Sequence, residues 1–309
     1  MKRTLPIRGY LFIIISAVIY GCMPLMANYI YLDGVNSLTL VLLRNLLSLP
    51  VLFVLGVLSG QSFRARPTAI GSAALIGIVG CAVTPLLLFS SYSYISGGTA
   101  TVFHFVYPAV VLILELLVLR TRARWGSVVA IVICAVGIVM FYDPTQGVDL
   151  VGGILALSSG VTYAVYIVLL GKFGTRGMGA YVFGFFAALG STVILLVTCL
   201  ASGQLALPRT VGGWLLSILF AAAVNGGAVI LFQRGTVLIG GQRASVLSTF
   251  EPLTSVVVGY LVFSEPIGWQ SGIGIILVLG ASVLIALFGG DDGKKENATP
   301  DEEKPTNVD

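Results

Sequence analysis

Charged residues are scarce in this chain. Only 10% of its 309 residues are Asp, Glu, Lys or Arg, whereas 57% are hydrophobic, and the mean hydropathy is +1.01. Soluble domains carry roughly 25% charged residues, so a water-soluble fold of this length could not cover its surface with so few. Lipid must therefore supply much of the solvent. The net charge of +4 is small, and the basic residues are spread over loops. The sequence therefore does not predict a nucleic-acid-binding surface.

Histidine and cysteine are also rare. His104 is the single histidine, and the 4 cysteines lie in separate apolar runs without a CxxC spacing. Zinc sites and disulfide frameworks need clusters or pairs of these residues. We therefore expect no metal site, no cofactor and no structural disulfide.

Catalytic and nucleotide-binding motifs are missing as well. Without a Walker A motif, this chain alone does not predict ATP-driven transport. A membrane enzyme would need a constellation such as HExxH or paired acids, and one histidine with scattered acids does not supply it. We therefore expect no enzyme.

The first apolar run, 9–31, exceeds the apolar core of a signal peptide, about 7–15 residues, and favours a membrane span over a cleavable leader.

Long apolar runs fill the chain instead. Short polar, glycine or proline breaks separate runs that suit the roughly 20 residues of a membrane-crossing helix. The sequence predicts an all-α integral membrane protein with ten transmembrane helices, and the long third and eighth spans predict a tilt or a break. The expected spans are 9–31, 37–59, 68–94, 98–119, 125–142, 150–171, 179–201, 212–238, 242–263 and 267–288.

Basic residues gather at one set of helix ends, which the positive-inside rule assigns to the cytoplasm. The opposite ends carry Arg209 alone, with Asp33, Asp143, Asp149 and Glu265. Both termini are therefore expected in the cytoplasm, and the polar tail 289–309 is expected to be disordered. The basic set is Lys2, Arg3, Arg8, Arg64, Arg66, Arg120, Arg122, Arg124, Lys172, Arg176, Arg243, Lys294 and Lys295.

The chain contains an internal duplication. Residues 95–139 align without gaps to 239–283 at an offset of 144, and "SAVIYG" at Ser16 resembles "SGVTYA" at Ser159. Because five spans is an odd number, two tandem copies must be inverted relative to each other. The sequence therefore predicts five-helix repeats at 1–144 and 145–288, the architecture of alternating-access transporters with a site near the midplane.

The second copy contains "GGQRASVLSTFEPLTSVVVGYLVFSEPIGWQ", residues 240–270. Its small-residue entry, Glu-Pro pair and later Ser-Glu-Pro resemble EamA-type transporters of the drug/metabolite transporter superfamily, over roughly residues 9–288. The resemblance implies ten helices, a 5+5 inverted repeat, a central cavity and a bacterial-type inner membrane location. That family includes exporters of amino acids and other metabolites. The first copy departs from the pattern, with "VYP" in place of Glu-Pro.

Glu251 and Pro252 lie inside an expected span. An acidic residue there costs about 3 kcal/mol or more to insert unless it is paired or faces water. Pro252, like its first-copy equivalent Pro108, should kink the helix, and Pro252 should free the carbonyl of Ser248. Glu251 is a candidate proton or amine site, with a structural hydrogen bond as the alternative.

Arg44 is the natural charge partner, since it also lies inside a span. It could hold a substrate carboxylate in bidentate fashion. The alternatives are snorkelling to the membrane surface or an ion pair with Glu115 or Glu251, and we favour these.

The remaining candidate substrate-binding residues are aromatic or polar. His104 and Tyr107 share a helix face and align with Ser248 and Glu251. Tyr20 and Tyr163 are equivalent in the two copies and could stack on cargo, and Asn225 could supply a cavity amide. Ordinary packing explains each of them as well.

The sequence thus predicts a secondary transporter of small organic metabolites working by alternating access, with amino-acid or metabolite efflux preferred. Proton coupling through Glu251 and an uncoupled facilitator both stay open, and so does a cargo of drug-like compounds or nucleosides. A membrane enzyme or a non-transporting membrane protein is a distant alternative. Small residues at four-residue spacing predict that the fifth and tenth helices are scaffold or a homodimer contact.

Overall fold

The computed structural model describes residues 7–119, 125–140, 149–173, 177–239, 247–248, 250–265 and 267–288. Regular structure among them is helical throughout, and these residues contain no strand. Several features predicted from the sequence lie outside this part of the chain. They are Lys2, Arg3, the basic loop 120–124, Asp143, Arg176, Arg243 and the tail 289–309.

The helices follow the predicted spans closely. The first half consists of α1 Ile7–Gly21, α2 Met23–Leu32, α3 Ser37–Leu58, α4 Pro67–Gly77, η1 Ile78–Val83, α5 Thr84–Ser91, α6 Gly97–His104, α7 Tyr107–Leu119 and α8 Trp125–Val139. The second half consists of α9 Leu150–Phe173, α10 Ala180–Ser202, α11 Val211–Ala221, η2 Ala222–Ala228, α12 Val229–Ile239, α14 Phe250–Phe263 and α15 Trp269–Phe288.

Within the described residues, 6 helical stretches are long and apolar enough to cross a membrane. Helices α6, α7, α8, α14 and α15 occupy the other predicted ranges. The all-helical membrane class is therefore confirmed. The six stretches are Ile7–Leu32, Ser37–Leu58, Pro67–Ser91, Leu150–Leu170, Ala180–Ser202 and Val211–Phe232.

Polar side chains cap the starts of several helices. The Asn36 side chain accepts a hydrogen bond from the Thr39 amide at 2.8 Å, which caps α3. Thr210 caps α11 in the same way, accepting from the Gly213 amide at 3.0 Å. These side chains satisfy backbone donors that a helix start leaves unpaired, so the breaks between apolar runs become helix boundaries.

The third and eighth spans each contain a π-helical segment. Segment η1 begins at Ile78 and η2 begins at Ala222, and 222 − 78 equals the repeat offset of 144. Widened turns of this kind expose backbone carbonyls to partners outside the helix. Asn45 of α3 donates to the Cys81 carbonyl at 2.8 Å, and Ser16 of α1 donates to the Ala228 carbonyl at 2.8 Å. The irregularity expected in these two long spans is therefore a π segment.

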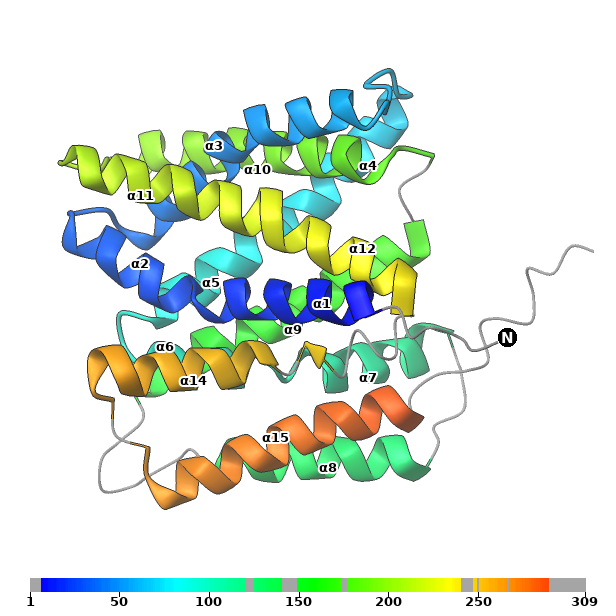
Figure 1. The fold of residues 1–309 in the computed structure, drawn as a ribbon, viewed down its shortest axis with the longest axis vertical. Coiled ribbons are helices and arrows are strands. Elements are labelled where there is room, and N and C mark those ends of the chain that lie inside the picture. The colour runs from blue at the N-terminus through cyan, green and yellow to red at the C-terminus, as the bar shows by residue number, and fades with distance from the viewer. Residues whose placement is uncertain are drawn as a thin grey trace, which may run out of the picture.

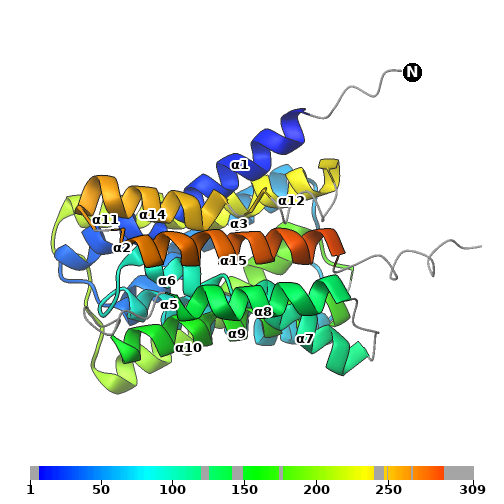
Figure 2. The ribbon, with the colours of Figure 1, turned by 90° about the horizontal axis from the view of Figure 1, so that it is seen from below.

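Helices α8 and α15 pack along each other at one edge of the molecule, and α3 packs along α10 at the opposite edge (Figures 1 and 2). Between these pairs, α1 contacts α12 and α14, while α9 contacts α5, α6 and α7. The outward faces of α8 and α15 expose apolar side chains such as Val132 and Ile276. These contacts suit a scaffold role, and the homodimer stays a prediction.

Candidate functional site

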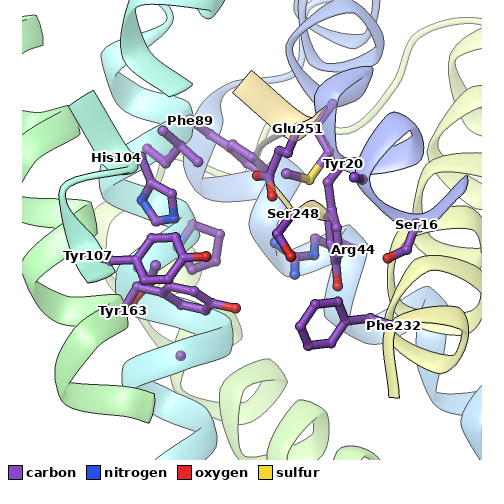
Figure 3. A pocket seen from close by; sticks show the side chains of 16 residues that line it. Ser16, Tyr20, Arg44, Phe89, His104, Tyr107, Tyr163, Phe232, Ser248 and Glu251 are labelled. Atoms are coloured by element: carbon purple, nitrogen blue, oxygen red, sulfur yellow. The ribbon is translucent and has the colours of Figure 1, made fainter. Parts of the chain in front are cut away.

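A cavity of about 130 Å³ lies between the two halves of the chain (Figure 3). Helices α1, α3, α5, α6, α7, α9, α12 and α14 all contribute to its wall. Six of the residues selected from the sequence line this central cavity. They are Tyr20, Arg44, His104, Tyr107, Tyr163 and Glu251.

Two broken helices deliver residues to the central cavity. Helix α6 ends at His104 and α7 begins at Tyr107, while in the other half Ser248 lies in a turn and α14 begins at Phe250. Proline is favoured in a first helical turn, where its missing N–H costs nothing, and Pro108 and Pro252 both occupy such turns. The breaks thus place the imidazole of His104 and the carboxyl of Glu251 at helix interruptions.

One detail differs from the prediction for Pro252. The carbonyl of Ser248 is not left free, because it accepts a hydrogen bond from the Glu251 amide at 3.0 Å. This bond ties Ser248 to the first turn of α14. The chain interruption precedes the proline, so Pro252 lies inside the new helix near its start.

His104, Tyr107 and Tyr163 form an aromatic wall. The ring centroids of Tyr107 and Tyr163 are 4.9 Å apart in an edge-on arrangement, and that of His104 is 5.3 Å from Tyr163. His104 Nδ1 lies 2.8 Å from Ser159 Oγ, whose proton is donated to the Ala156 carbonyl at 2.6 Å. Ser159 Oγ therefore accepts from Nδ1–H, which leaves Nε2 of the neutral ring as a hydrogen-bond acceptor.

Arg44 is half-buried on the opposite wall. Its Nε donates to Asn225 Oδ1 at 3.2 Å, and its guanidinium carbon lies 5.9 Å from the Phe89 ring centroid. Asn225 in turn donates to Ser48 Oγ at 3.1 Å. The hydrogen-bond partner of Arg44 among the described side chains is thus an amide.

Arg44 and Glu251 line the same cavity, and the structure records no ion pair between these two described side chains. Figure 3 shows both within one ring of side chains around the central cavity. The side chain of Glu115, the other predicted partner, lies outside the described residues. A guanidinium and a carboxyl group therefore face one space from different helices.

A second cavity, also of about 130 Å³, adjoins the first. The two share Tyr20, Arg44, Gly80 and Tyr163 as wall residues. Asn225, the remaining predicted site residue, lines this second cavity rather than the central one. The part of the chain that the structure describes has no group of three His, Cys, Asp or Glu residues that could hold a metal ion.

Several wall residues were not selected from the sequence. Phe89 lies beneath the Arg44 guanidinium, and Phe232 and Ser16 complete the central cavity. None of them carries charge, and none belongs to a motif that marks a binding site. A threonine-proline pair, Thr84-Pro85, interrupts the apolar run before Phe89 and could have pointed to this wall.

Comparisons with known proteins agree with this architecture. The sequence model of the EamA-like transporter family matches residues 7–142 and 150–287. The chain is 25% identical to the uncharacterized inner membrane transporter YicL of Salmonella typhimurium, over 91% of this chain and 95% of that protein. It is 28% identical to an uncharacterized transporter of Archaeoglobus fulgidus, over 89% of this chain and 94% of that protein.

A solved crystal structure shares the fold, with a TM-score of 0.66 and 15% sequence identity over 90% of this chain and 96% of the other. The family match extends over most of both halves and includes the helices that build the two cavities. Family and relatives point to transport rather than enzymatic catalysis. The chain therefore belongs to the EamA-like transporter family and is a multi-pass membrane transporter.

Proposed function

We propose that this transporter moves small organic zwitterions, with amino acids as the preferred class. The observation that carries the proposal is that Arg44 and Glu251 line one cavity without pairing with each other. A guanidinium binds a carboxylate through paired hydrogen bonds. An ionised carboxyl group binds an ammonium, so together the two side chains could hold both ends of an amino acid.

Two inverted five-helix repeats, residues 1–144 and 145–288, would carry this site. The equal spacing of the π segments, the matching helix breaks and the two family matches support the duplication. So do the pairings of α3 with α10 and of α8 with α15, which join equivalent helices. The apolar runs and the charge pattern support ten spans with both termini in the cytoplasm. The name of the Salmonella relative supports an inner membrane location.

Alternating access would proceed by rocking the two halves about the central cavity. Helices α6 and α14 meet through a 3.1 Å hydrogen bond between the buried hydroxyls of Thr101 and Ser255. With a cytoplasmic N-terminus, this contact lies on the outer side of the cavity. We therefore assign the structure to a state closed toward the outside.

Efflux is the preferred direction, by analogy with the family alone. Proton coupling through Glu251 is one form of the proposal, since an intramembrane carboxyl group can exchange protons with an aqueous cavity. A facilitator that runs down the cargo gradient is the other form. The two differ in whether a pH gradient drives accumulation.

Counterflow in proteoliposomes tests the proposal. A panel of labelled amino acids and nucleosides is exchanged by wild type, Glu251→Gln and Arg44→Gln, with and without an imposed pH gradient. Amino-acid exchange that Arg44→Gln abolishes would support the zwitterion site. Loss of the pH-driven component alone in Glu251→Gln would assign a proton, rather than the amino group of the substrate, to that residue.

The second candidate cargo is a neutral, flat compound such as a nucleoside or drug-like molecule. The aromatic wall of His104, Tyr107 and Tyr163 favours it, because rings stack on such surfaces. This alternative predicts nucleoside exchange that is indifferent to Glu251→Gln and Arg44→Gln but weakened by Tyr163→Ala.

A further inference from the structure

The second cavity meets the central cavity at Arg44. Tyr20, Gly80 and Tyr163 complete the shared wall, so the guanidinium stands at the junction of two spaces of similar size. Glu251 and the aromatic wall residue His104 line the central cavity and do not line the second one. Among the described lining residues, an acidic side chain therefore faces only one of the two spaces that meet at Arg44.

Apolar atoms supply most of the lining of the second cavity, as they do in the central cavity. The far wall of the second cavity is built by side chains of α3, α9, α10 and α12, among them Leu52, Tyr166, Phe183 and Ile230. Arg44 is the only charged side chain among its described lining residues, and it lies at the junction. Apolar walls favour an uncharged substituent, because a charge placed there would lose its hydration without a partner.

Two polar side chains on the wall of this cavity, Asn225 and Tyr181, are engaged within the protein. The Asn225 side chain accepts from Arg44 at 3.2 Å and donates to Ser48 at 3.1 Å. The Tyr181 hydroxyl accepts from Arg234 at 3.5 Å. These two groups therefore have little left to offer a polar ligand, and the other polar lining atoms outside the junction with Arg44 are uncharged.

We propose that the second cavity is the side-chain subsite of this transporter and takes an uncharged, mainly apolar substituent. The carboxylate of the substrate binds Arg44 at the junction, its amino group faces Glu251 in the central cavity, and its side chain enters the second cavity. This inference rests on the proposed function, since it needs a zwitterionic headgroup beside Arg44 and Glu251.

Gly184 of α10 is the position that tests the subsite. It lines the second cavity, and a Cβ built there would lie 3.7 and 3.9 Å from the two terminal carbons of Leu52, which is ordinary van der Waals contact. Gly80 is unsuitable, because a Cβ there would overlap the Tyr166 ring. Gly184→Ala should thus be accommodated, and Gly184→Leu should fill the cavity without distorting the junction.

The experiment measures counterflow KM values for glycine, alanine, leucine, phenylalanine, glutamate and lysine. We expect wild type to prefer leucine and phenylalanine and to exchange glutamate and lysine poorly. Gly184→Leu should raise KM for leucine and phenylalanine about tenfold, the effect of losing a few methylene-sized contacts in an apolar pocket. KM for glycine and alanine should stay within about twofold, since their side chains do not reach the subsite.

Gly280→Leu is the matched control, because Gly280 on α15 is exposed, lines neither cavity and has no atom within 4 Å of a built Cβ. It should leave every KM unchanged. If Gly184→Leu does not yield folded protein, Gly184→Ala is the test variant. It should raise KM for phenylalanine by a smaller factor and leave KM for glycine unchanged.

The outcomes separate this inference from the proposed function. Absence of exchange for all amino acids in wild type would overturn the zwitterion proposal and the subsite together. If wild type exchanges amino acids but Gly184→Leu changes KM equally for glycine and phenylalanine, or for neither, the subsite alone is overturned. Strong exchange of glutamate or lysine through the same site would also overturn it.

Discussion

The guanidinium of Arg44 donates to the side-chain oxygen of Asn225 at 3.2 Å, and this bond joins α3 of one half to the π segment η2 of the other. Asn225 holds Arg44 through Nε. The two terminal nitrogens of a guanidinium carry the donors that bind a carboxylate bidentately. The amide thus orients the guanidinium without neutralising it.

Replacing Asn225 by aspartate tests this relationship. The new carboxylate should pair with Arg44 and compete with the carboxylate of the substrate, because charge-assisted hydrogen bonds are about twice as strong as neutral ones. We expect Asn225→Asp to raise KM for amino acids by about tenfold or more, measured by counterflow. Asn225→Gln, which keeps the amide, is the control, and an unchanged KM in Asn225→Asp would show that Arg44 does not bind the substrate.

Close packing behind the aromatic wall predicts a stability effect. A Cβ built on Gly160 of α9 would lie 2.6 Å from the His104 carbonyl oxygen and 2.7 Å from Val106 Cγ1. Gly160→Val must therefore push α9 away from the break between α6 and α7, and overpacking of this kind costs about 1–3 kcal/mol. The measurement is the thermal unfolding midpoint in detergent. The same substitution at exposed Gly280 should have little effect, and equal midpoints for the two variants would contradict the packing argument.

Much of the fold was accessible from the sequence because apolar runs of membrane length leave few alternatives to helices. The repeat offset also gave useful site predictions, since it aligned His104 with Ser248 and Tyr107 with Glu251, and all four line the central cavity. Uniform hydropathy could not distinguish a π segment from an α-helix. Hydropathy showed only that the two spans containing a π segment are unusually long.

The rest depended on tertiary contacts between residues that lie far apart in the sequence. Arg44 and Asn225 are 181 positions apart, and nothing local in either sequence indicates their contact. Charge complementarity favoured an acidic partner for Arg44, yet an amide supplies the hydrogen bond. The second cavity is formed by residues such as Tyr166 and Gly184, which look like ordinary packing positions until the helices are assembled.

A pH effect is expected at the loop that joins α2 and α3. The Asp33 carboxylate accepts from the backbone amides of Thr210 and Arg209 at 3.1 and 2.8 Å, at the start of α11. These bonds, chiefly that from the Thr210 amide, hold the pKa of Asp33 below its usual range. Because the pKa of Asp33 is lower in the folded protein, its stabilising effect is complete above the pKa of aspartate in an unfolded chain, about 3.9. The effect is lost as pH falls through the lower pKa of the folded protein.

Asp33→Asn should therefore lower the unfolding midpoint at neutral pH. The difference from wild type should shrink as pH falls below about 4, where the wild-type carboxylate is protonated too. The measurement is thermal unfolding of both proteins at pH 7 and at several acidic values. A difference that stays constant across this range would show that the carboxylate charge is not what stabilises the start of α11.

The contact between α6 and α14 should control access to the cavities from outside. Thr101 and Ser255 are buried, their hydroxyls are 3.1 Å apart, and Ser255 also donates to the Gly97 carbonyl at 3.3 Å. A leucine at 255 cannot occupy this close approach, so it should favour a state in which the two helices separate. The native thiol of Cys81, which lines the second cavity, can report that opening.

Labelling with a membrane-impermeant maleimide, in a variant that keeps Cys81 as its single cysteine, measures the effect in right-side-out vesicles. We expect Ser255→Leu to raise the labelling rate about tenfold, which corresponds to a modest shift between two conformations. Val257→Leu, on the exposed face of the same helix, should not change the rate. A gate must change access to the cavities and not only the stability of the protein. If Ser255→Leu and Val257→Leu raised the labelling rate equally, the α6–α14 contact would have a purely structural role.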